Sequence, residues 1–275
     1  MIPLDEHEFH RAVEYVRAHY GINLEKKFAL VQARLSLDIE RKGYRSFKEY
    51  FDKVFAAPQS LEAQQMIDKI STNHTFFFRE PSCFEHMKNT ALPELLKRGI
   101  KQISIWSAAA STGQECYSIA MLLDDYLRAH KSEASFTVVG TDINSQVLKT
   151  AAAGVYPQSE FFKIPAVFRG RYCTQRSDGS FEICADLKSK ISWHKNNLID
   201  PTNAVFRYHL LFCRNVMIYF DAPTKQKLMQ RLHRAIYDDG YLYLGSTETI
   251  DPGRKYFAYI SPSVFAKNKV TKYER

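Results

Sequence analysis

The segment 106–115 constrains this 275-residue chain more than any other part of its sequence. It reads Trp106-Ser-Ala-Ala-Ala-Ser-Thr-Gly-Gln-Glu115 and joins the apolar run 103–106 to the apolar-rich run 117–123. The two runs predict a buried strand followed by a helix. A strand, a small-residue turn and a helix form the edge of a nucleotide-type pocket. Because the turn has one glycine, Gly113, it fits a pyrophosphate-wrapping loop poorly, and a ligand with adenosine but no phosphate, such as S-adenosylmethionine, suits it better.

Composition excludes several classes of protein. A hydrophobic content of 45% is enough for a packed core in one large domain or two modest ones. No apolar run approaches the roughly 18–20 residues that cross a bilayer, and the acidic N-terminus lacks a signal-peptide pattern. We therefore expect a cytoplasmic protein with no membrane insertion. The five cysteines and nine histidines show no metal-ligand spacing, so we expect no metal site and free thiols.

The net charge of +8 is unevenly distributed. Residues 1–70 hold 11 basic and 11 acidic side chains, so the whole excess lies after residue 70. Such an excess favours an acidic partner, either nucleic acid or an acidic protein surface, or it is simply a solvated surface. No dense basic run is interleaved with aromatic residues, so we expect no nucleic-acid partner.

Residues 1–70 predict helices only, and so a small helical bundle domain. The helices are expected over 5–21, 24–42, 46–57 and 60–70. Residues 71–99 predict a linker, a lid and a helical connection. From residue 100 to 275, strand-like runs alternate with helical ones, which predicts a Rossmann-like α/β domain with a mostly parallel sheet. The strands are expected at 103–106, 136–140, 209–213 and 241–244, and the helices from the turn to 129, at 145–153 and at 224–237.

Residues 170–196 interrupt this alternation and predict a small antiparallel β insert. The pair Asp178-Gly179 indicates a two-residue hairpin turn, and 191–194 would add a third strand. In that register Cys173 would lie opposite Cys184, near disulfide distance. Spacing alone leaves open whether the insert is a docking surface or a flap.

Two acidic residues follow the predicted strands. Asp142 ends the second strand, where Rossmann-like folds place an acid that accepts hydrogen bonds from ribose hydroxyls. A helix N-cap is the alternative role, although Asn144 or Ser145 could cap that helix instead. Glu115 lies at a helix N-terminus, where the helix dipole favours a carboxylate. It could also face the positive charge of a sulfonium or ammonium group.

Two further segments carry polar groups typical of a site. The apolar run 209–213 leads directly into Arg214 and Asn215, at a strand end where α/β proteins place ligand contacts. Residues 71–79 alternate aromatic and polar groups, which indicates a lid or channel wall. Arg79 at its end could hold a carboxylate substrate, because a guanidinium matches carboxylate geometry. A surface salt bridge is the alternative.

Six segments together resemble one known family. They are Ser71-Thr-Asn-His-Thr-Phe-Phe-Phe-Arg-Glu80, Trp106-Ser-Ala-Ala-Ala-Ser-Thr-Gly113, Gly140-Thr-Asp142, Asn197-Leu198, Phe212-Cys-Arg-Asn-Val-Met-Ile-Tyr-Phe220 and Gly245-Ser-Thr-Glu248. This combination closely resembles the CheR family of chemoreceptor glutamate methyltransferases. The likeness covers nearly the whole chain.

The resemblance implies an S-adenosylmethionine-dependent protein-glutamate O-methyltransferase. Such an enzyme forms methyl esters on the cytoplasmic helical domain of chemoreceptors for sensory adaptation, with S-adenosylhomocysteine as its product. It also implies contacts between the receptor and the N-terminal helices, and binding of a receptor C-terminal tail peptide at the β insert. We expect a monomer. By motif match, the residues implied for the cofactor site are Asn73, Thr75, Arg79, Glu115, Asp142, Asn197, Leu198, Arg214 and Asn215, and those implied for catalysis are Arg79 and Tyr219.

Two positions depart from the family pattern. Cys116 replaces a proline, and His209 stands where an aspartate is common. Neither change removes an implied cofactor contact, but both leave the catalytic rate open.

The implied reaction needs little acid–base help, because a glutamate carboxyl with a pKa of about 4.3 is ionised at neutral pH. Alignment then dominates catalysis. We expect Arg79 to orient the attacking carboxylate, and Tyr219 and Asn215 to shape the methionyl end of the cofactor site.

Three rival functions are less favoured. A nucleic-acid methyltransferase would fit the charge but would need an Asn/Asp-Pro-Pro-Tyr loop, and 214–216 reads Arg-Asn-Val instead. An adaptor that binds S-adenosylmethionine without transfer would require the two departures to abolish activity. A nicotinamide dehydrogenase would need a different glycine pattern.

Overall fold

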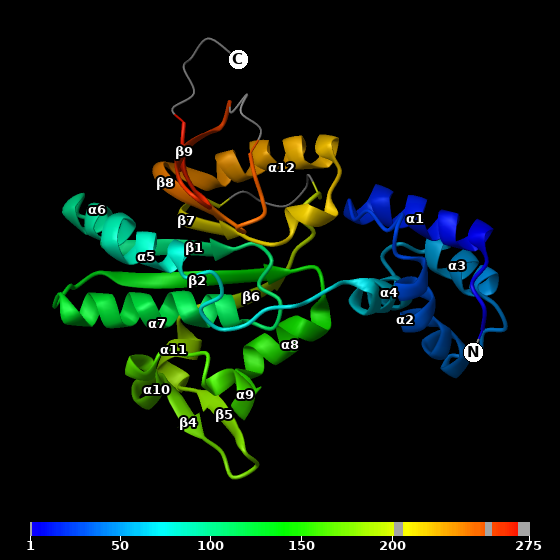
Figure 1. The fold of residues 1–275 in the computed structure, drawn as a ribbon, viewed down its shortest axis with the longest axis horizontal. Helices are drawn as coiled ribbons and strands as arrows, with labels where there is room; N and C mark the ends of the chain where they lie inside the picture. Colours follow the sequence, from blue (N-terminus) through cyan, green and yellow to red (C-terminus); the bar gives the residue numbers. More distant parts are fainter. Residues whose placement is uncertain (1, 201–205, 251–254, 269–275) are drawn as a thin grey trace.

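The computed structural model describes residues 2–200, 206–250 and 255–268. The N-terminal part forms a helical bundle with its own apolar core (Figure 1). Its helices are α1 (Glu6–Tyr20), α2 (Phe28–Arg41), α3 (Phe47–Ala56) and α4 (Leu61–Ile70). As predicted, Asp5 caps α1 and Gly21 ends it with a φ of +70°. Helix α2 begins later than predicted, because residues 24–27 form a turn that places Leu24 in the core.

A helical connection leads from the lid segment to the sheet. It consists of α5 (Ser82–His86), a π-helical turn η1 (Met87–Ala91) and α6 (Leu92–Lys97). Its buried side chains join the core of the α/β part. No helix in the part of the chain that the structure describes is long and apolar enough to cross a membrane.

The α/β part is built on a mixed sheet of the Rossmann-like type. Across the described residues, seven strands follow the order β6-β2-β1-β7-β8-β10-β9. Their bounds are β1 (Gln102–Ser107), β2 (Ser135–Asp142), β6 (Ile191–Lys195), β7 (Tyr208–Cys213), β8 (Ile236–Leu244), β9 (Phe257–Ser261) and β10 (Val264–Lys267). The first five in this order run parallel, and β10 is antiparallel to both β8 and β9. The predicted mostly parallel sheet is therefore confirmed.

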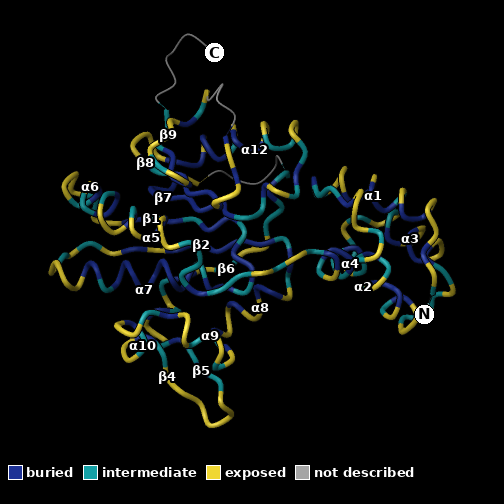
Figure 2. Tube along the Cα trace, in the orientation of Figure 1, coloured by how far each residue is buried: buried dark blue, intermediate teal, exposed yellow. Residues whose placement is uncertain are grey.

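Helices pack on this sheet as the alternating pattern predicts. Helix α7 (Gln114–Ala129) contacts β2, α8 (Ser145–Ala153) contacts β2 and β6, and α12 (Ala222–Ala235) contacts β8 (Figure 1). Helix α12 ends two residues before the predicted bound, and β8 begins at once, five residues earlier than predicted. In Figure 2 the central strands and α7 are largely buried, whereas the hairpin tip between β4 and β5 of the insert is exposed.

The insert differs from the prediction in its extent. Its sheet has the order β3-β5-β4, from β3 (Val155–Pro157), β5 (Ser180–Ile183) and β4 (Cys173–Gln175), with α9 (Gln158–Phe161), α10 (Ala166–Tyr172) and α11 (Ala185–Ser189) around it. It thus begins near residue 155, not 170. Strand β6, predicted as its third strand, instead extends the main sheet beside β2. Gly140 permits this, because a Cβ there would lie 2.5 Å from the Trp193 ring on β6.

The hairpin register also differs from the prediction by one residue. Cys173 pairs with Ile183 rather than with Cys184, and Gly179, with a φ of +79°, closes a three-residue loop. Cys184 follows the end of β5 and is the N-cap residue of α11. Both cysteines are free thiols.

Candidate functional site

An open cavity of about 1190 Å³ lies where β1, β2 and β7 end, facing the N-terminal helices. That volume includes the open solvent at the mouth of the cavity. The residues that the sequence predicted for the site all line this cavity. They are Asn73, Thr75, Arg79, Glu115, Asp142, Asn197, Leu198, Arg214, Asn215 and Tyr219.

The small-residue turn after β1 is held by its neighbours. Ala108 donates its N–H to Phe212 O and Ala110 donates to Thr141 O, both at 2.8 Å, so the turn is fixed to the two adjacent strands. Gly113 has a φ of +96°, and a Cβ there would lie 2.8 Å from that of Ala151. The absence of larger side chains leaves Ala108, Ala109 and Ser111 directly on the cavity wall.

Asp142 is buried at the tip of β2. One carboxylate oxygen accepts the Ser111 N–H at 2.8 Å and the other accepts the Asn144 N–H at 2.9 Å. Burial raises the pKa of Asp142, and these backbone hydrogen bonds offset that rise only in part. Asn144, rather than Asp142, caps α8 by accepting from the N–H groups of residues 146 and 147. The capping alternative for Asp142 is therefore excluded, and its carboxylate lines the cavity.

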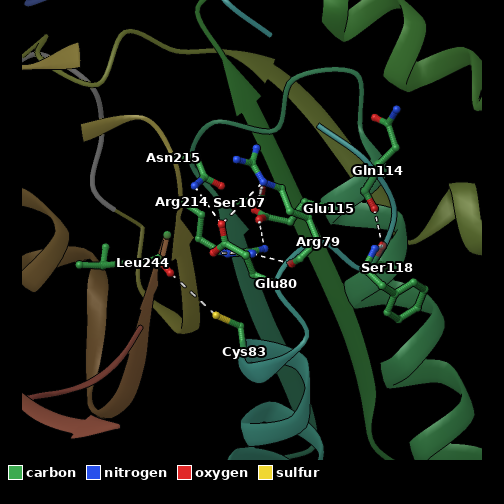
Figure 3. A network of polar contacts seen from close by, with 12 residues as sticks. Arg79, Glu80, Cys83, Ser107, Gln114, Glu115, Ser118, Arg214, Asn215 and Leu244 are labelled. Carbon is green, nitrogen blue, oxygen red and sulfur yellow. Dashed lines mark hydrogen bonds and ion pairs between the residues drawn. The ribbon is translucent and has the colours of Figure 1, made fainter. Parts of the chain in front are cut away.

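Arg214 is the centre of a buried charge cluster (Figure 3). Its Nη1 donates to Glu115 Oε2 at 2.8 Å, and its Nη2 donates to Glu80 Oε2 at 3.1 Å and to the carbonyl of Arg79 at 2.5 Å. Ser107 donates its hydroxyl to the other oxygen of Glu115 at 2.8 Å. Both terminal nitrogens of the guanidinium are thus engaged by protein oxygens, whereas its buried Nε has no hydrogen-bond partner among the described residues. We therefore assign Arg214 a role in organising the site.

The opposite charges of this cluster stabilise the ionised forms of its members. Burial alone would lower the pKa of Arg214, but Glu115, Cys83 and Glu80 together raise it above its ordinary value. Burial alone would raise the pKa of Glu80, but Asn215, Arg214 and the N–H of Ser246 lower it overall. Glu80 was missed as a functional candidate, although it directly follows the predicted lid segment.

Glu248 shapes the turn that carries Asn215. One of its oxygens accepts the N–H groups of Asn215 and Gly245, both at 2.8 Å, and the other accepts the Met217 N–H at 2.7 Å. Asn215 is held at a φ of +56°. These hydrogen bonds thus hold the end of β7 and the segment after β8 next to each other below the cavity.

The lid segment is attached to the small-residue turn. Ser111 donates its hydroxyl to Asn73 O at 3.0 Å. Arg79 donates to His74 O at 2.9 Å, and its guanidinium lies 5.8 Å from the centre of the Phe76 ring. The Arg79 side chain is 24% exposed, against 2% for Arg214. Arg79 is therefore the more accessible of the two arginines.

The N-terminal helical part completes the cavity, which the sequence did not predict. Asn23 donates its N–H to Tyr219 O at 2.8 Å, and Ile22 pairs with Phe220 in an antiparallel bridge. Asn197 donates to His19 O at 2.7 Å. The residues of this part that line the cavity are Tyr20, Ile22, Asn23, Leu24, Lys27, Leu30 and Ile70.

The two departures from the family pattern lie outside the cavity wall. His209 is near the opposite end of β7, where its Nδ1 lies 3.1 Å from the Ser104 N–H donor. Cys116 is fully buried in α7, and its Sγ would lie 2.9 Å from a Cβ added at Gly140. Neither side chain contributes to the surface that a ligand in the cavity would contact.

Comparison with known families agrees with this architecture. Residues 7–71 match the all-alpha domain of CheR methyltransferases, and residues 73–265 match their SAM binding domain. This chain belongs to the CheR methyltransferase family. S-adenosylmethionine is accordingly the cofactor of this CheR-family methyltransferase.

Curated relatives extend over almost all of this CheR-family chain. A chemotaxis protein methyltransferase of Borreliella burgdorferi is 36% identical over 273 residues, which cover 97% of this chain and 96% of that protein. A probable chemotaxis protein methyltransferase of Rhizobium etli is 34% identical, covering 84% and 88%. Chemotaxis protein methyltransferase 1 of Pseudomonas aeruginosa is 31% identical, covering 87% and 89%.

The cavity fits the cofactor of this family. Buried Asp142 offers acceptor oxygens of the kind that ribose hydroxyls require, and Glu115 offers a carboxylate near the turn. Apolar side chains, Phe84 and Leu198 among them, complete the wall. The residue types therefore match an adenosyl group that carries a positive sulfonium.

Proposed function

We propose that this protein transfers a methyl group from S-adenosylmethionine to glutamate side chains on the cytoplasmic helical domain of chemoreceptors. The resulting methyl esters would serve sensory adaptation. The observation that carries the proposal is one cavity that combines acids suited to an adenosyl sulfonium with an accessible guanidinium, Arg79. A guanidinium matches the geometry of a carboxylate substrate. The names of the curated relatives support a chemotactic substrate.

The proposed cofactor residues occupy three walls of the cavity. Asp142 accepts hydrogen bonds from the ribose hydroxyls, and Glu115 balances the positive charge of the methionyl end. Asn197 and Leu198 line the adenosyl side, whereas Asn73 and Thr75 close it from the lid. Arg214 and Asn215 hold the turn that carries Tyr219.

The proposed chemistry depends on alignment. Bound S-adenosylmethionine supplies the methyl carbon, which bonds to a carboxylate oxygen as the carbon–sulfur bond breaks and its electron pair stays on sulfur. Arg79 holds the attacking glutamate by its second oxygen, and Tyr219 walls the path between the two reactants. No proton has to move, because the carboxylate is already ionised at neutral pH. Positioning of this kind accounts for large rate gains.

The receptor contacts in this proposal lie on two parts of the chain. The N-terminal helices flank the cavity and can hold the receptor bundle next to Arg79. Strand β4 forms one edge of the insert sheet, with β5 on its inner side. A receptor tail peptide can add to such an edge as a further strand.

The proposal is tested with isotopically labelled S-adenosylmethionine and two substrates, a chemoreceptor cytoplasmic fragment and RNA. Label in alkali-labile esters on receptor glutamates supports it. Label on RNA, or cofactor binding without transfer to either, contradicts it. Arg79→Ala should lower the transfer rate far more than it lowers cofactor affinity. Full transfer by that variant would contradict the role of Arg79.

A further inference from the structure

Arg79 stands between two strained residues of the lid. Phe78 and Glu80 have φ values of +53° and +55°, in the left-handed region that non-glycine residues rarely adopt. Such conformations persist only where the surrounding structure imposes them, and they gather at functional sites. The direction of the Arg79 side chain therefore depends on the contacts that hold its two neighbours.

Phe78 is held by helix α7 and by aromatic packing. Its N–H donates to Ser118 Oγ at 2.9 Å, and that hydroxyl donates to Gln114 O at 2.7 Å (Figure 3). Its ring lies 5.2 Å from that of Phe84 and 5.3 Å from that of Phe168, measured between centroids. This side of the lid is fixed by buried, uncharged contacts.

Glu80 is held by charge and by two separate segments. Its Oε1 accepts from Asn215 Nδ2 at 3.2 Å, and its Oε2 accepts from Arg214 Nη2 at 3.1 Å and from the Ser246 N–H at 2.9 Å. The same Arg214 nitrogen donates to the carbonyl of Arg79 at 2.5 Å. A closed ring of contacts thus joins the lid to the strand end at the base of Arg79.

The side chains of Arg79 and Glu80 differ in what they can reach. Arg79 lines the cavity, with its Nε 3.7 Å from Glu80 Oε1. Glu80 does not line it, and its carboxylate is directed at Arg214 and Asn215. Glu80 can therefore influence a reaction in the cavity only through the groups that it holds.

We infer that Glu80 is a positioning residue for methyl transfer. Its ionised carboxylate, with Arg214, fixes the strained lid turn so that Arg79 faces the carboxylate of the substrate. This inference rests on the proposed glutamate methylation. A displaced orienting group can cost about a hundredfold in rate, so loss of the Glu80 carboxylate should lower kcat on that scale while cofactor affinity changes little.

The experiment compares four proteins with wild type: Glu80→Ala, Arg79→Ala, the double variant and Glu85→Ala. Glu85 is an exposed glutamate five residues further on and serves as the matched control. Transfer to a receptor cytoplasmic fragment gives kcat and KM, and calorimetry gives the affinity for S-adenosylmethionine. Glu80→Gln, which keeps the shape of the side chain and an acceptor oxygen, replaces Glu80→Ala should the latter fail to fold.

A positioning role has a signature that a structural role lacks. Arg79→Ala removes the group that Glu80 positions. The kcat of the double variant should therefore lie within about twofold of the kcat of Arg79→Ala alone. Glu85→Ala should match wild type. Losses that multiply in the double variant, or a cofactor affinity that falls as far as kcat, would overturn the inference. If wild type fails to label receptor glutamates, the proposed function itself is wrong and the inference falls with it.

Discussion

The two ends of the parallel strands carry polar groups in different settings. At the amino end of β7, His209 lies against Ser104 of β1 and 4.6 Å from the ring of Tyr237 on β8, so these contacts join only neighbouring strands of the sheet. At the carboxyl end, Arg214 joins carboxylates from the lid and from α7, which lie more than 90 residues away in the chain. Open α/β sheets bind ligands at this carboxyl edge. Polar groups that tie the sheet to the lid and to a helix mark the functional edge, whereas we expect a polar contact between neighbouring strands to contribute to stability.

The largest effect is expected from Arg214→Met. Removing this buried cation leaves Glu115 and Glu80 without their partner, and breaking a buried pair in this way costs about 3–5 kcal/mol of unfolding free energy. Arg214→Lys keeps the charge but not the planar fork, so its loss should be smaller. Chemical denaturation measures both. A loss below about 1 kcal/mol for the methionine variant would show that the cluster is not a structural centre.

Asp142→Asn should weaken S-adenosylmethionine binding about 10–100-fold, because hydrogen bonds to a charged acceptor contribute about 1.5–3 kcal/mol. The wild-type affinity should also depend on pH. Burial raises the pKa of Asp142, so protonation removes the carboxylate acceptor at a higher pH than for a solvated aspartate. Affinity should therefore fall as pH falls through that raised pKa, and the asparagine variant should lack this dependence. Calorimetry at several acidic pH values measures the cofactor affinity of both proteins. If the affinities of wild type and of Asp142→Asn changed with pH in parallel, the proposed contact between Asp142 and the ribose would be contradicted.

Gly21→Ala tests the contribution of the N-terminal helices. Gly21 has a φ of +70°, and a Cβ there would lie 2.9 Å from Ile199 Cγ2 across the contact between the two parts. Gly43, at a φ of +84° with open space around it, is the matched control. Both variants should lose about 1–2 kcal/mol through the left-handed backbone. Only Gly21→Ala should also weaken cofactor binding, because it displaces the segment that holds Tyr219. If calorimetry gave the same cofactor affinity for Gly21→Ala and for its control, the N-terminal helices would not contribute to the cofactor site.

Local sequence patterns predicted the parts of the site that are themselves local. The strand, turn and helix around Gly113 and the acid at the end of β2 follow from neighbouring residues. The hydrogen bond from Asn23 to Tyr219 O could not be predicted, because it joins positions almost 200 residues apart. Strand β6 was assigned to the wrong sheet because five residues do not specify the edge that they join. The hairpin register was wrong because Gly179 serves a three-residue loop as well as a two-residue one.

The smallest effect is expected from His209→Asp, a substitution away from the cavity. A carboxylate oxygen can accept the Ser104 N–H as the histidine ring does, so kcat and KM should stay within about twofold and stability within about 1.5 kcal/mol. The pH dependence should change more clearly. Burial, and then the charge of Arg98, lower the pKa of His209, so the folded state favours the neutral ring. Wild type should lose stability as pH falls below about 6.5, where the unfolded chain gains a proton first. The aspartate variant should lack the part of this loss that His209 causes, whereas the parts from His86 and His233, whose pKa values burial also lowers, remain. Denaturation midpoints at pH values on both sides of 6.5 would reveal the difference. A change in transfer rate larger than the change in stability would place His209 in the functional half of the sheet.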